Sequence, residues 1–395
     1  MECAYKNLKS ELHQELLNIL SYWKLNTIDV EHGGFLGKRD FYNKVVPKAN
    51  KGIILNSRIL WSFSYASNYL KHKDYLNICE RSYNYIKAYF NDNTYGGVFW
   101  EADYKGNPIN RKKQIYAQSF TIYALSEYYK LTKNENAKNW AIEIFKLLEK
   151  HARDKNDGGY FEAFNEDWSP IKDMRLSDKD MNASKTMNTH LHVLEAYTSL
   201  LSIYKNDELK SALESLVHLF QNTFLNTNHH YQLFFNDQWE LLSNSVSFGH
   251  DIECAWLVID AARALNDNDL IKATEATAIK VADTFLKEGI NKDGAVFNEK
   301  NLDTNHTDND LHWWPQVEAL IGLDYAYQLS GKESYIHKSL QIWEFTKKHL
   351  IDKENGEWHF RVDKNGKPYV IEDKVSMWKA PYHTSRACIK LNSEL

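Results

Sequence analysis

His250 occupies a position where an imidazole can act as an acid or a base. It belongs to the stretch Ser-Phe-Gly-His-Asp-Ile-Glu, residues 247–253, which precedes an apolar run with helical spacing, and Ser247 is a suitable N-cap. The positive end of the helix dipole disfavours the imidazolium ion, so a neutral base would be available near pH 7. Glu253 follows one turn later on the same face of the predicted helix.

The starts of five further predicted helices carry side chains that could also take part in chemistry. Simple capping residues would be enough at such positions. Instead, the sequence places there Arg58, Tyr116 with Gln118, Asn188 with His192, Trp313 and Trp314 with Glu318, and Trp378 followed by His383. If the six helix starts surround one opening, these side chains form a single site.

Two neutral histidines on opposite sides of a sugar are suited to proton exchange at a carbon next to a carbonyl group. In an open-chain aldose, one imidazole would remove the C2 proton and leave an enediolate, which donors such as Arg58, Tyr116 or a third histidine would stabilise. The other imidazole would return a proton to the opposite face and invert C2. No nucleotide cofactor is needed, and the sequence contains no glycine-rich phosphate loop.

Three other classes of protein fit part of this pattern. His250 and Glu253 could share a metal ion, but no third ligand has a matching spacing. His190 and His192 would point about 200° apart on a helix, so we expect no metal. A glycoside hydrolase could use Glu253 and Glu318 as its carboxylate pair, which would leave the histidines without a role. A sugar-binding protein would bind without turnover.

A short glycine motif recurs about every 62 residues. It occurs at 32–35 (His-Gly-Gly-Phe), 95–99, 157–161, 293–297 and 355–358. The interval between the third and fourth copies corresponds to roughly two periods, so a further unit is expected at 231–239, without its glycines. Six units at a fixed period indicate a repeated supersecondary structure.

Each unit is predicted to contain two helices separated by the glycine turn and a short extended pair. The first helices are amphipathic: 8–23, 76–90, 140–151, 209–225, 271–287 and 335–349. The second helices are apolar on nearly all faces and therefore buried: 57–70, 116–131, 186–204, 248–265, 312–329 and 383–391. The pattern predicts an all-α fold, an (α/α)6 barrel, with hairpins at its mouth that turn at 105–108 and 365–368. An open α-solenoid is the alternative.

Composition limits the domain organisation and the partners. The 395 residues contain no linker-like segment, which favours one domain spanning residues 1–395. A net charge of −5 without basic clusters argues against nucleic acid or an anionic membrane as partner. No apolar run could span a bilayer or serve as a signal peptide, and the four cysteines are far apart. We therefore expect a cytoplasmic protein with free thiols, and a monomer.

Aromatic residues are unusually frequent, at 12 Trp, 24 Tyr and 18 Phe. They could fill a large helical core or stack on the apolar faces of sugars. Composition alone does not decide between these two roles.

At the positions identified above, the sequence resembles the N-acylglucosamine 2-epimerase superfamily, and within it the branch that acts on cellobiose. The most specific strings are Asn-Thr-His-Leu-His at 188–192 and Gly-His-Asp-Ile-Glu at 249–253. The remaining matches follow in the family's order: 56–58, 116–120, 313–318 and 378–383. The resemblance therefore covers nearly the whole chain.

The resemblance implies an (α/α)6 barrel that epimerises the reducing-end glucose of β-1,4-linked disaccharides such as cellobiose and lactose to mannose, without a metal or another cofactor. By analogy, His250 and His383 are the acid/base pair, and His192 assists ring opening or holds a sugar oxygen. The implied sugar-binding residues are Arg58, Tyr116 and Asn188 around the reacting residue, Trp314 and Trp378 as stacking partners, Glu253 and Glu318 as orienting groups, and Trp313.

Two positions stand apart from this pattern. His190 also matches, but helix geometry turns it away from His192, so it is expected to pack. Thr384 follows His383 where the family more often has Asn, which affects the local hydrogen bonding. Within the superfamily, an N-acylglucosamine or mannose 2-epimerase and an aldose–ketose isomerase remain alternatives, because an isomerase differs only in returning the proton to C1.

Overall fold

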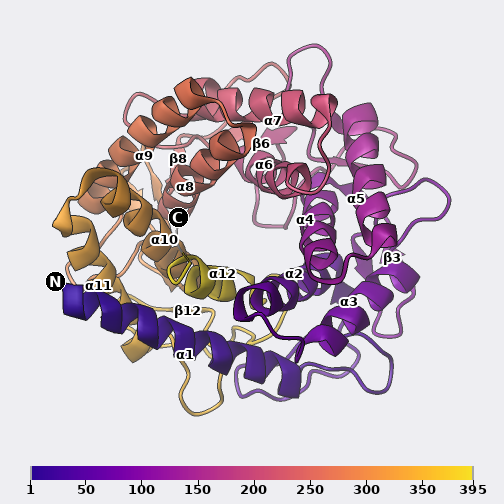
Figure 1. The fold of residues 1–395 in the computed structure, drawn as a ribbon, viewed down its shortest axis with the longest axis horizontal. Coiled ribbons are helices and arrows are strands. Elements are labelled where there is room, and N and C mark those ends of the chain that lie inside the picture. Colours follow the sequence, from indigo (N-terminus) through magenta and orange to yellow (C-terminus); the bar gives the residue numbers. More distant parts are fainter. Residues whose placement is uncertain (1, 394–395) are drawn as a thin grey trace.

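The computed structural model describes residues 2–393 as two concentric rings of helices (Figure 1). The inner ring consists of α2 (Ile53–Leu70), α4 (Ile115–Thr132), α6 (Met187–Leu201), α8 (Phe248–Leu265), α10 (Trp313–Ser330) and α12 (Tyr382–Lys390). The outer ring consists of α1 (Glu2–Asn26), α3 (Leu76–Tyr89), α5 (Glu135–Leu147), α7 (Asp207–Leu219), α9 (Asn268–Glu288) and α11 (Glu333–His349). The π-helical turns η1 (Leu148–Ala152) and η2 (Phe220–Phe224) extend α5 and α7.

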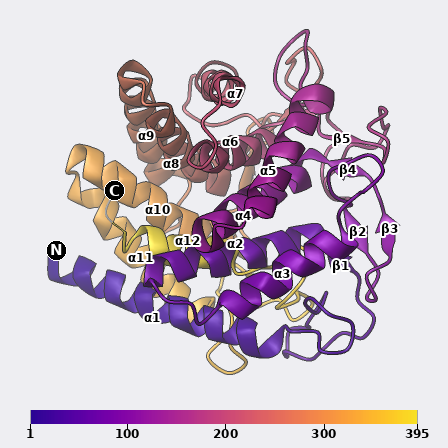
Figure 2. The ribbon, with the colours of Figure 1, turned by 45° about the vertical axis from the view of Figure 1, so that its right-hand side comes forward.

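The inner ring is closed. Each inner helix contacts the next, and α12 contacts α2, so the first and last inner helices are neighbours. In the outer ring, α1 packs against both α12 and α11, which brings the two ends of the chain together (Figure 2). The predicted (α/α)6 barrel is confirmed, and the open solenoid is wrong, because an open array would separate its terminal helices.

The two rings differ in burial as their sequences predict. In α8, the consecutive residues Trp256, Leu257 and Val258 point about 100° apart around the helix and are all buried. In α9, by contrast, Val281 and Phe285 are buried on one face while Lys287 is exposed. An inner helix is covered on all sides by its neighbours, so its burial requires an apolar surface all round.

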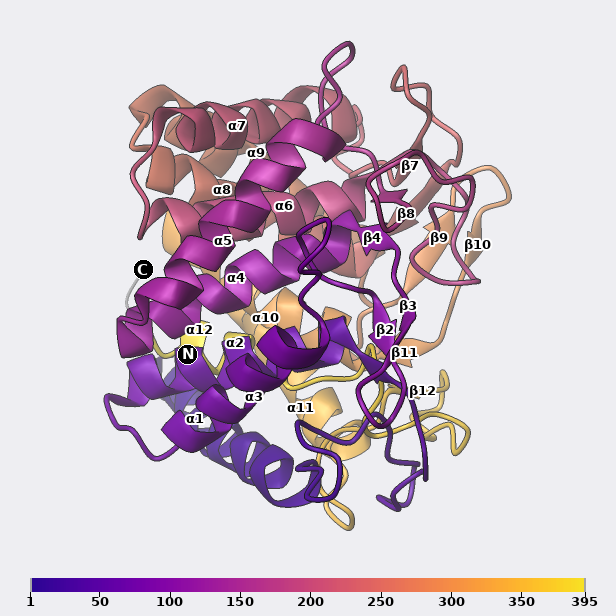
Figure 3. The same ribbon diagram turned by 90° about the vertical axis from the view of Figure 1, so that its right-hand side faces the viewer.

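Short turns join each inner helix to the following outer helix, whereas the long return connections carry all the strands of the described chain. These connections gather at one end of the barrel, where the inner helices begin (Figure 3). The strands are β1 (Lys51–Gly52), β2 (Glu101–Ala102), β3 (Pro108–Asn110), β4 (Lys113–Gln114), β5 (Ala163–Phe164), β6 (Lys185–Thr186), β7 (Phe234–Phe235), β8 (Ser245–Ser247), β9 (Glu299–Asn301), β10 (His306–Thr307), β11 (Leu311–His312) and β12 (Arg361–Val362).

Antiparallel pairs connect neighbouring units around the mouth. The strand before an inner helix pairs with a strand of the following unit in β1–β2, β4–β5, β6–β7, β8–β9 and β11–β12. A bridge between Arg39 and Val375 joins the first unit to the last. The turn predicted at 105–108 connects β2 to β3, and the turn predicted at 365–368 ends in a bridge between Val362 and Pro368.

The glycine repeat corresponds to a β-bridge that closes each turn after an outer helix. Its six copies are Ile28–Phe35, Asn91–Val98, Arg153–Tyr160, Leu225–Tyr231, Ile290–Val296 and Ile351–Trp358. The fourth copy has no glycine, as predicted, but it lies at 225–231, directly before the predicted 231–239. There His229 supplies a left-handed residue with φ of 64°. The sixfold repeat is therefore confirmed.

A buried ion pair recurs beside four of these turns. Asp92 accepts backbone N–H groups of Thr94 and Tyr95 through one oxygen, and its other oxygen lies 2.6 Å from Nζ of Lys113. The other copies are Lys51–Asp29, Lys185–Asp154 and Lys374–Asp352. These pairs stabilise the loops at the base of the mouth.

Several helices begin before their predicted first residue, and in α5 a capping residue explains the difference. The inner helix α8 has its predicted bounds, whereas α5 begins at Glu135 instead of Trp140. Asn134 caps α5 by accepting from the N–H groups of Asn136 and Ala137. No helix within residues 2–393 is long and apolar enough to cross a membrane.

Candidate active site

The predicted site residues gather at the strand-bearing end of the barrel because the inner helices all begin there. They lie in the first two turns of α2 (Arg58), α4 (Tyr116), α6 (Asn188, His192), α8 (His250, Glu253) and α10 (Trp313, Trp314, Glu318), or close to the start of α12 (Trp378, His383). The six helices belong to six different repeats. Closure of the barrel therefore brings side chains more than 300 residues apart in the chain into one region.

His383 is oriented by a carboxylate. Its Nδ1 lies 2.7 Å from Oε1 of Glu318, and both residues are buried. Glu318 also accepts from Nε1 of Trp256 at 3.3 Å and from Arg386. Because an ionised carboxylate can only accept, this contact makes Nδ1 the protonated nitrogen and leaves Nε2 of His383 with a free lone pair.

His192 is also oriented by a carboxylate, which lies on the same helix. Its Nδ1 lies 3.0 Å from Oε2 of Glu195, one turn later in α6. Glu195 also accepts from the hydroxyl of Tyr382 at 2.6 Å and from Arg386. The ring of His192 packs edge-on against Tyr116, with centroids 4.7 Å apart.

His250 has a hydroxyl as partner instead of a carboxylate. Its Nδ1 lies 2.9 Å from Oγ of Ser247. Ser247 is the N-cap residue of α8, as predicted, but its side chain makes no hydrogen bond to the backbone of this helix. Within residues 2–393, no protein atom contacts Nε2 of His192, His250 or His383 by a hydrogen bond.

Trp314 lies between the two histidines of the predicted acid/base pair. Its half-buried ring is 4.7 Å from that of His250 and 5.6 Å from that of His383. Trp313 is buried; its ring is tilted against that of Phe360, with centroids 4.7 Å apart, and makes a T-shaped contact with His383 at 6.3 Å. Of the two adjacent tryptophans, Trp314 therefore faces the opening.

Arg58 connects the tyrosine and the second tryptophan of the site. It donates to the hydroxyl of Tyr116 at 2.8 Å and to the carbonyl of Trp378 at 3.1 Å, and its guanidinium lies 4.5 Å from the ring of Phe120. The half-buried ring of Trp378 packs against Tyr116 and Trp100. These contacts hold the guanidinium of Arg58 and the hydroxyl of Tyr116 near His192, where both can donate hydrogen bonds.

Asn188 lines a pocket together with His250. Its Oδ1 is buried and has no hydrogen-bond partner among residues 2–393, so it is available to a ligand. The same pocket is bounded by the 174–183 loop, to which the sequence analysis gave no role. Its remaining wall includes Glu162, which accepts from Thr186 and Thr189 at the start of α6.

Burial keeps the site histidines neutral. Desolvation lowers the pKa of His250 to about 4 and lowers the pKa of His383 well below its usual value. Desolvation also lowers the pKa of His192, although Glu195 opposes this shift. Each imidazole is therefore a neutral base over the physiological pH range.

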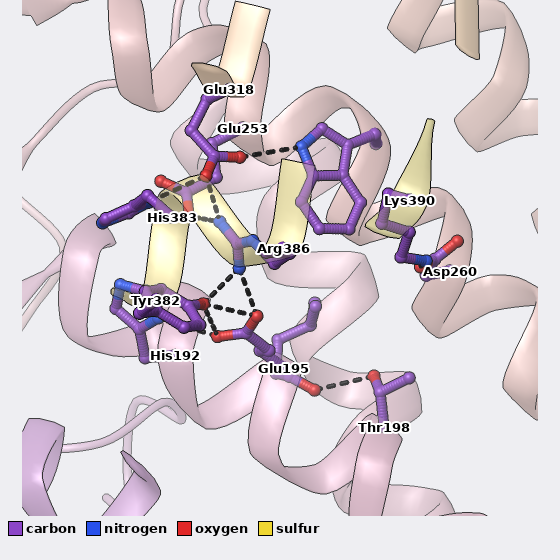
Figure 4. A network of polar contacts seen from close by, with 12 residues as sticks. His192, Glu195, Thr198, Glu253, Asp260, Glu318, Tyr382, His383, Arg386 and Lys390 are labelled. Atoms are coloured by element: carbon purple, nitrogen blue, oxygen red, sulfur yellow. Dashed lines mark hydrogen bonds and ion pairs between the residues drawn. The ribbon is translucent and has the colours of Figure 1, made fainter. Parts of the chain in front are cut away.

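The positive charge at the centre of the site is the guanidinium of Arg386. Ligand atoms of Glu253, Glu318 and His383 lie within 4.8 Å of one another, a spacing that could hold a metal ion. However, Nη2 of Arg386 donates to both carboxylates (Figure 4). Its guanidinium supplies the positive charge that these carboxylates require, so their donor set does not fit a metal ion.

Two residues of the helix starts serve the fold and lie outside the site. His190 is buried, accepts from the N–H of Tyr160 at 2.8 Å and contacts the carbonyl of Thr186, which agrees with its predicted packing role. Gln118 binds the N–H and the carbonyl of Val98 in the same way. Both side chains hold the closing bridge of a neighbouring glycine turn.

The sequence analysis missed three residues of the central network. Glu195, Tyr382 and Arg386 connect His192 to His383. A signal was present: Glu195 follows His192 by three residues and Arg386 follows His383 by three, so each shares a helix face with a site histidine. Glu253, expected to face His250, contacts Arg386 instead.

Comparison with known proteins agrees with the fold and with the arrangement of the site. A family model described as N-acylglucosamine 2-epimerase (GlcNAc 2-epimerase) matches residues 34–387. The chain belongs to the N-acylglucosamine 2-epimerase family. The predicted enzyme class, an isomerase of the carbohydrate epimerase type, is confirmed by this membership and by the relatives.

The relatives of this chain are named as carbohydrate epimerases or isomerases. The chain is 42% identical to the cellobiose 2-epimerase of Bacteroides fragilis, over 98% of this chain and 99% of that protein. The solved cellobiose 2-epimerase of Bacillus thermoamylovorans has a TM-score of 0.92 at 36% identity, with 98% of each chain covered. A D-mannose isomerase of Marinomonas mediterranea is 23% identical over 97% of this chain and 96% of that protein.

Proposed function

We propose that this chain is a cellobiose 2-epimerase, which inverts C2 of the reducing-end glucose of β-1,4-linked disaccharides such as cellobiose and lactose to give mannose. The observation that carries the proposal is the pair formed by His250 and His383. Both rings lie against Trp314, both are buried enough to be neutral, and both have an unpartnered Nε2. Relatives named cellobiose 2-epimerase support the disaccharide substrate.

In the proposed reaction, one imidazole removes the C2 proton of the open-chain sugar through Nε2. The electron pair moves into the C1–C2 bond and the carbonyl oxygen becomes an enediolate oxygen. Arg58 and the hydroxyl of Tyr116 lie 2.8 Å apart and offer donors to this oxygen. The other imidazole takes up a proton from solvent on Nε2 and donates it to the opposite face of C2. The first imidazole releases the abstracted proton to solvent, so protons and charges balance and both histidines return to the neutral state.

The remaining residues bind the sugar in this proposal. The rings of Trp314 and Trp378 stack on the two sugar units, the free Oδ1 of Asn188 accepts from a hydroxyl, and His192 assists ring opening. Glu318 orients His383, and Glu253 acts through Arg386. Trp313 supports His383 from behind. No metal takes part, because Arg386 provides the central cation.

We further propose that residues 1–395 act as one catalytic domain, monomeric and cytoplasmic. The four cysteines are unpaired in the described part of the chain, which is compatible with a reducing compartment. Sedimentation velocity of the purified chain should give a species of 46.3 kDa. A dimer would contradict the monomer.

The proposed reaction is tested by NMR time courses in D2O with EDTA, using cellobiose, lactose, glucose, mannose and N-acetylglucosamine in parallel. We expect the two disaccharides to gain a mannose-type reducing end with deuterium at C2. Reaction of a monosaccharide alone would contradict the disaccharide assignment. A ketose labelled at C1 would identify an isomerase, which the relation to a D-mannose isomerase makes the second candidate. Release of glucose would indicate a hydrolase.

A further inference from the structure

Arg386 lies at the centre of the network that connects two site histidines. It occupies α12 one turn after His383 and is fully buried. Its Nη2 donates to Oε1 of Glu318 at 2.6 Å and to Glu253, and its Nη1 donates to Glu195 and contacts the hydroxyl of Tyr382 (Figure 4). One guanidinium therefore serves three carboxylates that come from three different helices.

Two of these carboxylates each orient a histidine. Glu195 contacts Nδ1 of His192, and Glu318 contacts Nδ1 of His383. An ionised carboxylate has no proton to donate, so Nδ1–H must donate and Nε2 keeps its lone pair. A protonated carboxyl group could donate instead, and the imidazole would then carry its proton on Nε2, where it could not act as a base.

We propose that Arg386 is a positioning residue that keeps Glu195 and Glu318 ionised and thereby fixes His192 and His383 in the tautomer whose Nε2 is the free base. The proposal rests on the proposed proton exchange for its catalytic consequence. Its structural part, the tautomer, does not require that any substrate be turned over.

The charge balance of the cluster explains why one cation is decisive. Burial would raise the pKa of Glu195, but Arg386, with His192 and Tyr382, outweighs burial and lowers it to about 2. Burial raises the pKa values of Glu253 and Glu318, a neighbouring carboxylate adds to each rise, and Arg386 opposes it. The titratable groups that interact with the charge of Arg386 include Tyr65 on α2, Tyr116 and Tyr123 on α4, Glu195 on α6, Glu253 on α8, Glu318 on α10, and Tyr382 and His383 on α12.

Lys390 provides a matched control on the same helix. Its Nζ lies 5.2 Å from the ring of Trp256, on which the guanidinium of Arg386 also packs at 4.8 Å. Lys390 pairs with Asp260 at 2.6 Å, and within residues 2–393 that carboxylate makes no hydrogen bond to a histidine. Removing Lys390 thus removes a half-buried cation of α12 without changing the carboxylates that orient His192 and His383.

The test is long-range 1H–15N NMR of the ligand-free enzyme with 15N-labelled histidine, recorded at pH 7.5 together with kcat and KM for cellobiose. We expect His192 and His383 to be protonated at Nδ1 in the unmodified enzyme. In Arg386→Met, we expect a shift toward the Nε2–H tautomer and a fall in kcat of about 10²–10⁴-fold, with a smaller change in KM. Arg386→Lys should retain part of the Nδ1–H tautomer and part of kcat. Lys390→Met should leave His192 and His383 protonated at Nδ1.

Several results would overturn the proposal. Nε2–H signals for His192 and His383 in the unmodified enzyme would do so without any variant, which matters if Arg386→Met does not fold. A folded Arg386→Met with both histidines still protonated at Nδ1 would reduce Arg386 to a structural residue. If the tautomers behave as expected but no sugar epimerises, the proposed function fails and the positioning role of Arg386 stands.

Discussion

Nδ1 of His250 lies 2.9 Å from the hydroxyl of Ser247, whereas Nδ1 of His383 lies 2.7 Å from a carboxylate oxygen of Glu318. The two histidines of the proposed acid/base pair are therefore oriented by groups of different charge. A carboxylate makes its imidazole more basic than a hydroxyl does. The pair is chemically asymmetric even though both rings lie against Trp314.

Substitution Ser247→Ala should slow the reaction without abolishing it. The hydrogen bond from Ser247 fixes the ring of His250 but carries no charge, and a neutral hydrogen bond contributes about 0.5–1.5 kcal/mol. We expect kcat for epimerisation to fall about 2–10-fold, with an unchanged melting temperature. Ser119→Ala is the control, because this buried serine on α4 bonds only to the carbonyl of Ile115. Equal effects of the two substitutions would contradict the orienting role of Ser247.

The pH dependence of kcat/KM should show no ionisation near pH 6.5, where an exposed histidine would titrate. Burial lowers the pKa of His250 to about 4, so the imidazole remains neutral and basic well below its ordinary value of 6.5. We expect kcat/KM for cellobiose to be constant from pH 8 to pH 6 and to fall only below about pH 5. The measurement uses initial rates, with enzyme from each pH assayed again at pH 7 to detect unfolding. An acidic midpoint near 6.5 would show that His250 is solvated.

Replacing His190 by Gln should make the fold less sensitive to acid. Burial lowers the pKa of His190 to about 4. Below pH 6.5 this histidine is therefore protonated in the unfolded chain but stays neutral in the folded chain. The resulting loss in the free energy of unfolding is absent above pH 6.5 and grows to roughly 2 kcal/mol at pH 5. In His190→Gln, denaturant unfolding should show a smaller loss of stability between pH 7 and pH 5.

Gln is the appropriate replacement because the chain already uses it at equivalent positions. Gln316 accepts from the N–H of Val296 and donates to the carbonyl of His312, as His190 does with Tyr160 and Thr186. His190→Ala is the contrasting variant and should lose about 1–3 kcal/mol at pH 7, because the N–H of Tyr160 is left unpaired. If Gln and Ala behaved alike, the proposed equivalence of the repeats would be wrong.

The buried ion pairs beside the glycine turns should be costly to break. Lys113→Met leaves Asp92 buried and unpaired, which should lower the free energy of unfolding by about 3–5 kcal/mol. Lys332→Met removes an exposed pair with Asp283 and should change it by less than about 1 kcal/mol. Adding Asp92→Asn to Lys113→Met should recover part of the loss. Urea unfolding measures all three, and no recovery in the double variant would refute the ion-pair explanation.

The fold could be predicted because its determinants are local and repeated. The glycine turns mark the period, and the apolar surface of segments such as 248–265 requires burial on all sides. Closure of the ring followed from the number of repeats. The weak copy at 225–231 was placed too late, at 231–239, because His229 takes the left-handed position that glycine occupies elsewhere and the turn has no glycine to mark it.

The site was predictable only in part, for a physical reason. A sequence pattern places side chains such as His192 and His383 at helix starts, but it does not say what lies across the barrel. The contacts of Arg386 with Glu195, Glu253 and Glu318 join helices that are between 68 and 191 residues apart in the chain. Ser247 was correctly placed at the N-cap of α8, but the sequence did not show that its hydroxyl contacts the imidazole of His250 and not the helix backbone.

The most direct test of the account is deuterium exchange at C2 in D2O by His250→Asn and His383→Asn, with cellobiose and its mannose epimer as separate substrates. Each histidine is proposed to serve one face of C2, so both variants should lose epimerisation by at least about 10³-fold. Each should still exchange the C2 proton of one epimer, and the two variants should differ in which epimer that is. If either variant epimerised at the normal rate, or both exchanged the same epimer, the two-histidine mechanism would be contradicted.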